Sequence, residues 1–499
     1  MAEVEDLYRP YKQKRRTRGS IAREKGLAPL AEAIFAQDGQ DPAGLAAGFI
    51  DPEKGVNSVE EALQGANDII AEDLSDDADI RKSLRELVMR RGTLTCTAAE
   101  DAEADGVYKL YYDFSQPISR VLDHQILAMN RGEKEGVLKP NVILAGNEGA
   151  ALVCRAALKP TMQVSAFVRT AAEDAYERLI FPSIQREVRS DLSDRAYAGA
   201  IDNFALNLKP LLMQPPVKGF VTMGLDPGYR NGCKVAVVDA TGKVLATTVV
   251  YPTFNERKKQ EAISSLSVLM RKYGVRHIAI GNGTASRETE AMTVELLKSF
   301  PEASYMIVSE AGASVYSASP LAAEEFPDYD VNLRSAVSIA RRLQDPLAEL
   351  VKIDPKAIGV GQYQHDCPQK ELDAALGAVV EDCVNAVGVD ANTASRSLLQ
   401  QVSGLTATTA KNIIAYREEN GPFTSRAQLK KVPKLGPKAF EQCAGFLRIP
   451  ESKEILDNTG VHPESYAAAK ALLNLLGCKK GEDFSSLTEK LNAYGLSKA

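Results

Sequence analysis

Two short stretches decide how this sequence is interpreted: LQQVSGLTATTAKNII at residues 399–414 and LKKVPKLGPKAF at residues 429–440. Each predicts a helix that ends in an apolar hairpin with a glycine, Gly404 or Gly436, after which a second helix begins at once. Glycine lets the hairpin backbone turn tightly and approach a ligand closely. The first amides of the new helix have no intrahelical partner and can face an anion. The repeat therefore predicts two helix-hairpin-helix units in tandem.

The charge of this segment favours binding to nucleic acid. Residues 395–448 carry nine basic and three acidic side chains, a net charge of +6, on a chain whose formal net charge is −6. A single glycine-capped hairpin is typical of an ordinary helix pair, but two of them in a basic segment predict contacts with the phosphate backbone of DNA or RNA. Such contacts carry little base information and weaken steeply with salt. The predicted contact residues are Ser403, Gly404, Leu405, Lys411, Lys434, Leu435, Gly436 and Lys438.

The remainder of the chain predicts a mostly helical protein with one α/β domain. Before Pro215 and Pro216 the apolar residues recur at helical spacing, and from Gly219 onward three strand patterns precede alternating helices and strands. That order indicates a mixed sheet. The predicted domains are a helical N-terminal region at 1–216, the α/β domain at 217–350, a connecting loop and helix at 351–390, the hairpin units at 391–450 and a helical C-terminal segment at 451–499.

The turn after the first of these strands, residues 224–228 (GLDPG), places the carboxylate of Asp226 at a strand end. This pattern resembles the YqgF/RuvC-like branch of the RNase H fold, whose first strand carries a metal-binding Asp in such a turn. In active members two or three further carboxylates converge on that Asp to hold two metal ions. Here the central strand ends in residues 280–283 (IGNG) without a carboxylate, and the final helix carries Arg334 near the position of the last acid.

The missing acids leave two interpretations of the α/β domain. The favoured one is a catalytically degenerate domain, with no enzyme activity, metal or cofactor, in which Asp226 and Glu310 are vestigial. The alternative is a structure-selective nuclease that uses Asp226 and Glu310 with Mg²⁺ or Mn²⁺. Asp226 could equally be a turn residue that accepts backbone hydrogen bonds. Residues 281–284 predict a strand-to-helix turn with a Thr or Ser cap, with a phosphate cradle as the alternative.

Composition excludes several function classes. Tryptophan is absent and aromatic residues make up 6% of the chain, which argues against a wide stacking platform for single strands. No pair among the seven cysteines has metal-ligand spacing, so free thiols in a reducing cytosol are predicted. The sequence shows no apolar leader and no run of about 18 apolar residues, so a cytoplasmic protein without membrane contact is expected.

Several stretches together resemble the Tex family of bacterial transcription accessory proteins: residues 6–12, 178–183, 224–234, 281–290, 338–345 and 359–366. The resemblance implies a helical N-terminal part, a YqgF-like domain, tandem hairpin units and a C-terminal OB-fold RNA-binding domain. It also implies nucleic acid and the transcription machinery as partners. Against that pattern, the chain is expected to lack the N-terminal extension and the OB-fold.

Overall fold

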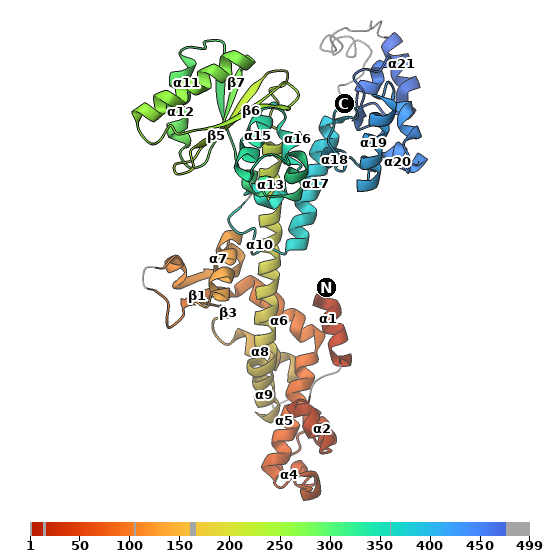
Figure 1. The fold of residues 1–499 in the computed structure, drawn as a ribbon. Coiled ribbons are helices and arrows are strands. Elements are labelled where there is room, and N and C mark those ends of the chain that lie inside the picture. Colours follow the sequence, from red (N-terminus) through yellow and green to blue (C-terminus); the bar gives the residue numbers. More distant parts are fainter. Residues whose placement is uncertain (1, 13–15, 104–105, 160–165, 360, 476–499) are drawn as a thin grey trace. The chain divides into compact units, whose positions relative to one another are not determined.

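The computed structural model describes residues 2–12, 16–103, 106–159, 166–359 and 361–475, which form two compact units, 1–200 and 201–499 (Figure 1). The predicted fold class, mostly helical with one α/β domain, is confirmed. Six cysteines lie within the described residues, and all six are buried and free, as predicted; Cys478 lies outside those residues. Among the described residues, no helix has the length and apolarity that crossing a bilayer requires.

The first unit is built around the long helix α5 (Val59–Asp76). Ser58 caps it by accepting a hydrogen bond from the Glu61 amide, and Ala62, Ala66 and Ile69 form its buried face. A π-helical turn at Ala175–Ile180 joins α9 to α10. The other helices are α1 (Ala2–Tyr8), α2 (Arg18–Glu24), α3 (Ala28–Phe35), α4 (Pro42–Ala47), α6 (Ala78–Arg91), α7 (Asp123–Lys134), α8 (Glu148–Ala157), α9 (Ala166–Asp174) and α10 (Phe181–Leu212), which continues into the second unit.

A small antiparallel sheet interrupts this helical region, so the prediction of helices throughout residues 1–216 is wrong in this part. Its strands are β1 (Thr93–Ala98), β2 (Asp113–Pro117) and β3 (Leu138–Ile143), in the order β2-β1-β3. In β1, Leu94 and Cys96 are buried, while the alternating Thr93, Thr95 and Thr97 are more exposed. The period-2 alternation of TLTCT at 93–97 is the signal that the helical interpretation overlooked.

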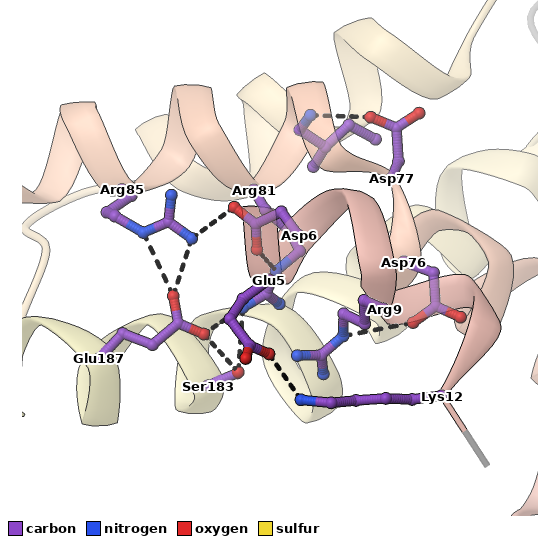
Figure 2. Close-up of polar contacts among 11 residues, drawn as sticks. Glu5, Asp6, Arg9, Lys12, Asp76, Asp77, Arg81, Arg85, Ser183 and Glu187 are labelled. Carbon is purple, nitrogen blue, oxygen red and sulfur yellow. Dashed lines mark hydrogen bonds and ion pairs between the residues drawn. The ribbon is translucent and has the colours of Figure 1, made fainter. Parts of the chain in front are cut away.

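A buried ion-pair network joins α1, α6 and α10 within the first unit (Figure 2). The Arg81 side chain is 1% exposed, and its Nε donates to Asp6 Oδ1 at 2.7 Å. Arg85 Nη2 lies 2.6 Å from Asp6 Oδ2 and 2.9 Å from Glu187 Oε2, and Arg81 also donates to Ser183 and Glu187. Each buried charge has an opposite charge beside it, which offsets the cost of removing it from water. The network holds the N-terminal helix against the rest of the unit.

The second unit contains the predicted mixed sheet, with strand order β6-β5-β4-β7-β8. The first three strands in sequence pair antiparallel, and β7 and β8 run parallel to β4. The strands are β4 (Thr222–Asp226), β5 (Cys233–Val238), β6 (Val244–Val250), β7 (His277–Gly281) and β8 (Ser304–Val308). The parallel strands end at the same edge as β4, so the residues that follow β4, β7 and β8 lie near one another.

Helices cover both faces of this sheet (Figure 1). One face packs on α11 (Glu256–Tyr273) and α12 (Ser286–Leu297) around buried side chains such as Leu225, Leu266 and Ile278. The other face packs on α15 (Val331–Gln344), which approaches β4 so closely that a Cβ at Gly224 would lie 2.2 Å from the Ala336 carbonyl oxygen. Three short helices surround α15: α13 (Ala313–Ser317), α14 (Pro320–Glu325) and α16 (Pro346–Leu350).

The hairpin region follows the long helix α17 (Gln369–Val387). A short parallel pair, β9 (Val389–Asp390) with β10 (Leu447–Arg448), brackets the helices α18 (Arg396–Leu399), α19 (Ala407–Asn420) and α20 (Pro437–Cys443). Two short 3-10 helices and α21 (Tyr466–Leu475) follow, in agreement with a helical continuation after residue 450. Residues 476–499 of the predicted C-terminal segment lie outside the described residues.

Candidate nucleic-acid interface

The two hairpins have equivalent backbones. Residues 402–406 (VSGLT) correspond to residues 432–436 (VPKLG), and the third residue of each has a positive φ: 83° at Gly404 and 64° at Lys434. Gly436 was expected to be the turning glycine of the second hairpin, but its φ is −71° and it is the N-cap of α20. A lysine therefore adopts the left-handed conformation that glycine adopts in the first hairpin.

The leading residues of the first hairpin are engaged inside the protein. The Ser403 amide donates to Asn385 Oδ1 at 3.2 Å, and its hydroxyl contacts Asn385 and Glu381 on α17. A Cβ at Gly404 would lie 2.5 Å from Gln442 Cβ on α20, so this glycine permits the two hairpin units to pack together. Leu405 is buried beneath the turn. These three residues position the hairpin.

The two hairpins differ in how their second helix begins. Thr406 caps α19 by accepting a hydrogen bond from the Thr409 amide at 3.2 Å, and Thr409 caps Thr406 in return. Gly436 has no side chain with which to cap α20, and Pro437 has no N–H to donate. The amides of the first turn of α20 are therefore more open to an external acceptor than those of α19.

The exposed positive charge of this region comes mainly from lysines. Lys411 on α19 is exposed, as are four lysines on and beside the second hairpin: Lys430, Lys431, Lys434 and Lys438. Within the part of the chain that the structure describes, none of the five has an ion-pair partner, although Lys430 Nζ lies 4.8 Å from the centroid of the Phe440 ring. Leu435 is buried beneath this hairpin, as Leu405 is beneath the first.

Three arginines that contribute to the net charge of +6 are withdrawn from solvent in whole or in part: Arg426 is buried, and Arg417 and Arg448 are half-buried. Arg417 donates to the carbonyls of Ala391 and Ala394, both at 2.9 Å, and Arg448 donates to Gly445. Burial lowers the pKa of both guanidinium groups. Six exposed cations remain: Arg396, Lys411, Lys430, Lys431, Lys434 and Lys438.

The third arginine, Arg426, is 1% exposed and organises the segment after the second hairpin. Its guanidinium donates to Leu447 O at 2.8 Å, Val461 O at 2.7 Å and the Tyr466 hydroxyl at 2.7 Å. It also donates to Leu456 and Thr459. Each acceptor lies 21 to 40 residues away in sequence, so no local pattern could have revealed the role of Arg426.

Asp226 lies at the end of β4, where it pairs in register with Lys234 on β5. Burial raises the pKa of Asp226 to about 6, the Lys234 ammonium opposes that shift, and the negative charge of Glu310 adds to it. The structure shows no hydrogen bond to the Asp226 carboxylate from any described residue. The interpretation of Asp226 as a turn residue that accepts backbone hydrogen bonds is therefore wrong.

Glu310 follows β8 and lies over the turn after β7. A Cβ at Gly283 would lie 1.7 Å from Glu310 Oε1, and one at Gly281 would lie 2.6 Å from Oε2, so the two glycines leave room for this carboxylate. The Glu310 amide donates to Asn282 Oδ1 at 3.0 Å. The fold thus places Glu310 near enough to Asp226 for its negative charge to add to the raised pKa of Asp226.

The other positions of a two-metal site have structural roles. Arg334 donates to the carbonyls of Phe326 and Ser317, at 3.1 and 3.3 Å, and so joins α15 to the segment before it. The predicted Thr or Ser cap is wrong, because Ala285 is the N-cap of α12, with a φ of 68° and no capping side chain. Among the described residues, no three His, Cys, Asp or Glu side chains are placed to share a metal ion.

Comparison with known families gives four matches along the chain. A Tex central region-like model matches residues 37–204, and a Tex protein YqgF-like domain matches residues 220–344. A helix-hairpin-helix motif matches residues 384–448, and an HHH domain matches residues 454–498. The matches agree with the mixed sheet and the paired hairpins.

Relatives resemble the chain over nearly its whole length. Protein tex of Bordetella pertussis is 49% identical over 491 residues, which cover 94% of this chain and 62% of that protein. Transcriptional accessory protein Tex of Neisseria gonorrhoeae is 48% identical over 493 residues, 96% of this chain and 64% of that protein. Uncharacterized protein YdcI of Bacillus subtilis is 50% identical over 503 residues, 100% of this chain and 70% of that protein. The chain therefore spans about two thirds of these relatives, and it belongs to the Tex family.

Proposed function

We propose that the chain is a non-enzymatic transcription accessory protein that binds the phosphate backbone of DNA or RNA through its tandem hairpins. Family membership and the two helix-hairpin-helix matches support nucleic-acid binding. The observation that carries the finer proposal is the second hairpin, where Lys434 and Lys438 are exposed and have no ion-pair partner among the described residues, beside an uncapped helix start. Such a surface contacts phosphates and reads little sequence. The transcription machinery is the proposed protein partner.

A charge reversal at the hairpins tests this proposal. Replacing Lys411, Lys434 and Lys438 with Glu should reduce affinity for a duplex and for a single strand by more than about tenfold at low salt, because like charges then face the phosphates. Fluorescence anisotropy with labelled oligonucleotides gives the measurement. A matched control replaces three exposed lysines of the α/β domain, Lys243, Lys272 and Lys298, with Glu. If both triple variants lose equal affinity, only net charge matters and the hairpins are not the interface.

A second candidate function is the metal-dependent, structure-selective nuclease that uses Asp226 and Glu310. Their electrostatic coupling at one sheet edge favours it. Two carboxylates with Lys234 beside one of them form a poorer ligand set than the three or four carboxylates of a two-metal site. Incubation with branched and single-stranded substrates in Mg²⁺ or Mn²⁺ decides between the candidates. Cleavage that disappears in Asp226→Asn would establish the nuclease and overturn the non-enzymatic proposal.

A further inference from the structure

A cavity of about 470 Å³ lies beside the second hairpin. One part of its lining is apolar and consists of Leu435, Pro437, Phe440 and Pro463. Leu435 and Pro437 belong to the hairpin and the start of α20, whereas Pro463 comes from the 3-10 helix Pro463–Ser465. The cavity therefore forms where the hairpin module meets the segment that follows it.

Polar groups form the other part of the lining. They are Lys430, Glu441, His462 and Glu464. Contacts with the protein fix the imidazole in place: His462 Nε2 lies 2.8 Å from the Glu441 carbonyl oxygen, and Nδ1 lies 3.4 Å from the Glu464 amide. Phe440 is 8% exposed, and Lys430 Nζ lies over its ring, 4.8 Å from the centroid, so a base that packs on this ring displaces the mobile lysine head group. An aromatic ring, a cation and two carboxylates thus face one small volume.

This combination suits a nucleobase. The flat π-face of a base packs on aromatic and proline side chains, and such stacking tolerates any base. A carboxylate accepts hydrogen bonds from an exocyclic amino group, and a lysine donates to a ring nitrogen or carbonyl oxygen. A base within a duplex is stacked on both faces and paired at its edge, so only an unpaired base can enter.

The cavity is continuous with the proposed phosphate contacts. Leu435 and Pro437 flank Gly436, and the exposed Lys434 and Lys438 are the next residues on either side. A nucleotide whose phosphate is held by these lysines presents its base within reach of the cavity wall.

We propose that this cavity binds one unpaired nucleobase of the nucleic acid whose backbone the hairpins hold. The inference rests on the proposed function and adds a substrate class to it: strands with a bulge, an overhang or another unpaired nucleotide. The base adds stacking and edge contacts to the phosphate contacts. The protein therefore binds a strand with an unpaired nucleotide more tightly than a continuous duplex, without reading an extended sequence.

Three matched duplexes test the proposal with the full chain, each made as DNA and as RNA. The first is continuous, the second carries one bulged nucleotide, and the third carries the same bulge with an abasic residue, which keeps the phosphate and removes the base. Anisotropy titrations at one salt concentration should give about tenfold tighter binding to the bulged duplex than to the abasic one.

Two variants locate the effect. Phe440→Leu keeps an apolar side chain but removes the ring, and His462→Ala removes a rim group that is partly exposed. Both should remove the difference between the bulged and abasic duplexes while binding to the continuous duplex stays within about twofold. His365→Ala, an exposed histidine outside the cavity lining, is the matched control and should keep the difference. Urea denaturation verifies that the Phe440→Leu variant remains folded. If that variant is unfolded, the result for His462→Ala alone tests the base cavity.

The outcomes separate this inference from the proposed function. Equal affinity for the bulged and abasic duplexes, with binding to the continuous duplex intact, overturns the base cavity and leaves the phosphate interface standing. A difference that persists in His462→Ala also overturns it, because the base then binds elsewhere. Absence of binding to all three duplexes at low salt overturns both.

Discussion

Lys434 adopts a backbone conformation that residues other than glycine rarely take, with a φ of 64°. A left-handed conformation costs such a residue about 1–2 kcal/mol, whereas glycine has more backbone entropy to lose on folding, about 0.5–1 kcal/mol. The first hairpin places Gly404 at the equivalent position. A lysine that accepts this strain at an exposed hairpin is consistent with a contact role.

Lys434→Gly should therefore separate stability from binding. The free energy of unfolding should rise by up to about 1 kcal/mol, while affinity for nucleic acid falls. The slope of log affinity against log salt should become shallower by about 0.9, which corresponds to one phosphate contact. Urea denaturation and anisotropy titrations at several salt concentrations give the two quantities. Lys438→Ala, which removes the same charge from an ordinary helical position, should weaken binding without the gain in stability. Unchanged affinity in Lys434→Gly would show that this lysine does not touch the ligand.

The half-buried carboxylate of Asp226 makes stability depend on pH in an unusual direction. Its pKa in the folded chain, about 6, exceeds the value of about 3.9 expected for an unfolded chain. The folded state therefore binds more protons between about pH 4 and pH 6, and the stability that this proton contributes is lost as pH rises through that window. Asp226→Asn removes the buried charge, so its stabilising effect should grow from near zero at pH 4 to at most about 3 kcal/mol at pH 7.

Urea denaturation of both proteins at several pH values measures this difference. Asp239 provides a control of opposite sign. Burial acts to raise its pKa, but hydrogen bonds from Thr241 and the Lys243 amide lower it overall. Asp239→Asn should therefore lose stability at pH 7 and recover it as pH falls. A pH-independent effect of Asp226→Asn would mean that water reaches the half-buried Asp226 carboxylate well enough to keep its pKa near the value of an unfolded chain.

At the scale of elements, one side chain joins the second hairpin unit to the segment after it. Arg426 begins the 3-10 helix Arg426–Lys431 and donates to carbonyls on β10 and on the segment between β10 and α21. Its amide donates to Asp457, whose carboxylate also accepts from Tyr466. The planar fork of five donors matches this set of acceptors, which a lysine cannot do.

Arg426→Lys should lower the free energy of unfolding by roughly 3 kcal/mol, because several buried carbonyls lose their donor at once. Denaturation in urea and susceptibility to limited proteolysis between residues 445 and 466 report the loss. Arg396→Lys, at an exposed site near the first hairpin, should change stability by less than about 0.5 kcal/mol. Equal effects of the two changes would mean that the acceptors find other donors.

At the scale of the whole molecule, the number of exposed cations limits the salt dependence of binding. Six exposed cations remain in the hairpin region after the buried Arg426 and the half-buried Arg417 and Arg448 are excluded. Each phosphate contact contributes about −0.9 to the slope of log affinity against log salt for duplex DNA, so the slope should be no steeper than about −5. Replacing Lys411, Lys434 and Lys438 with Gln should reduce its magnitude by about 3. An unchanged slope would place the main interface outside the hairpins.

The domain boundaries remain proposals: 1–216, 217–350, 351–390, 391–450 and 451–499. The helix α10 ends at Leu212, and the next regular element, β4, begins at Thr222. A protease that cuts after the exposed residues between them, such as Lys218, should release a folded fragment close to the first boundary. Cleavage that occurs first inside the sheet or the hairpin region would contradict this division.

Local patterns in the sequence were sufficient for the hairpins and for the five strands between residues 222 and 308. Each of these depends on residues that are neighbours along the chain, so periodicity, glycines and strand ends carry the information. The same patterns failed at residues 93–143, where short strands separated by long connections form one sheet. They also assigned the turn of the second hairpin to Gly436, because a lysine at positive φ has no sequence signature.

Only the tertiary structure decided which charges face solvent. Arg417, Arg426 and Arg448 count toward the basic segment in the sequence, yet they donate to carbonyls that folding brings beside them. Asp226 and Glu310 are 84 residues apart along the chain and share one sheet edge because β4 and β8 both run parallel to β7. Burial and long-range hydrogen bonds depend on residues distant in the sequence, whereas helix, turn and strand patterns depend on near neighbours. The sequence by itself therefore determined the family of folds and the hairpin motif, and packing determined which side chains remain free to bind.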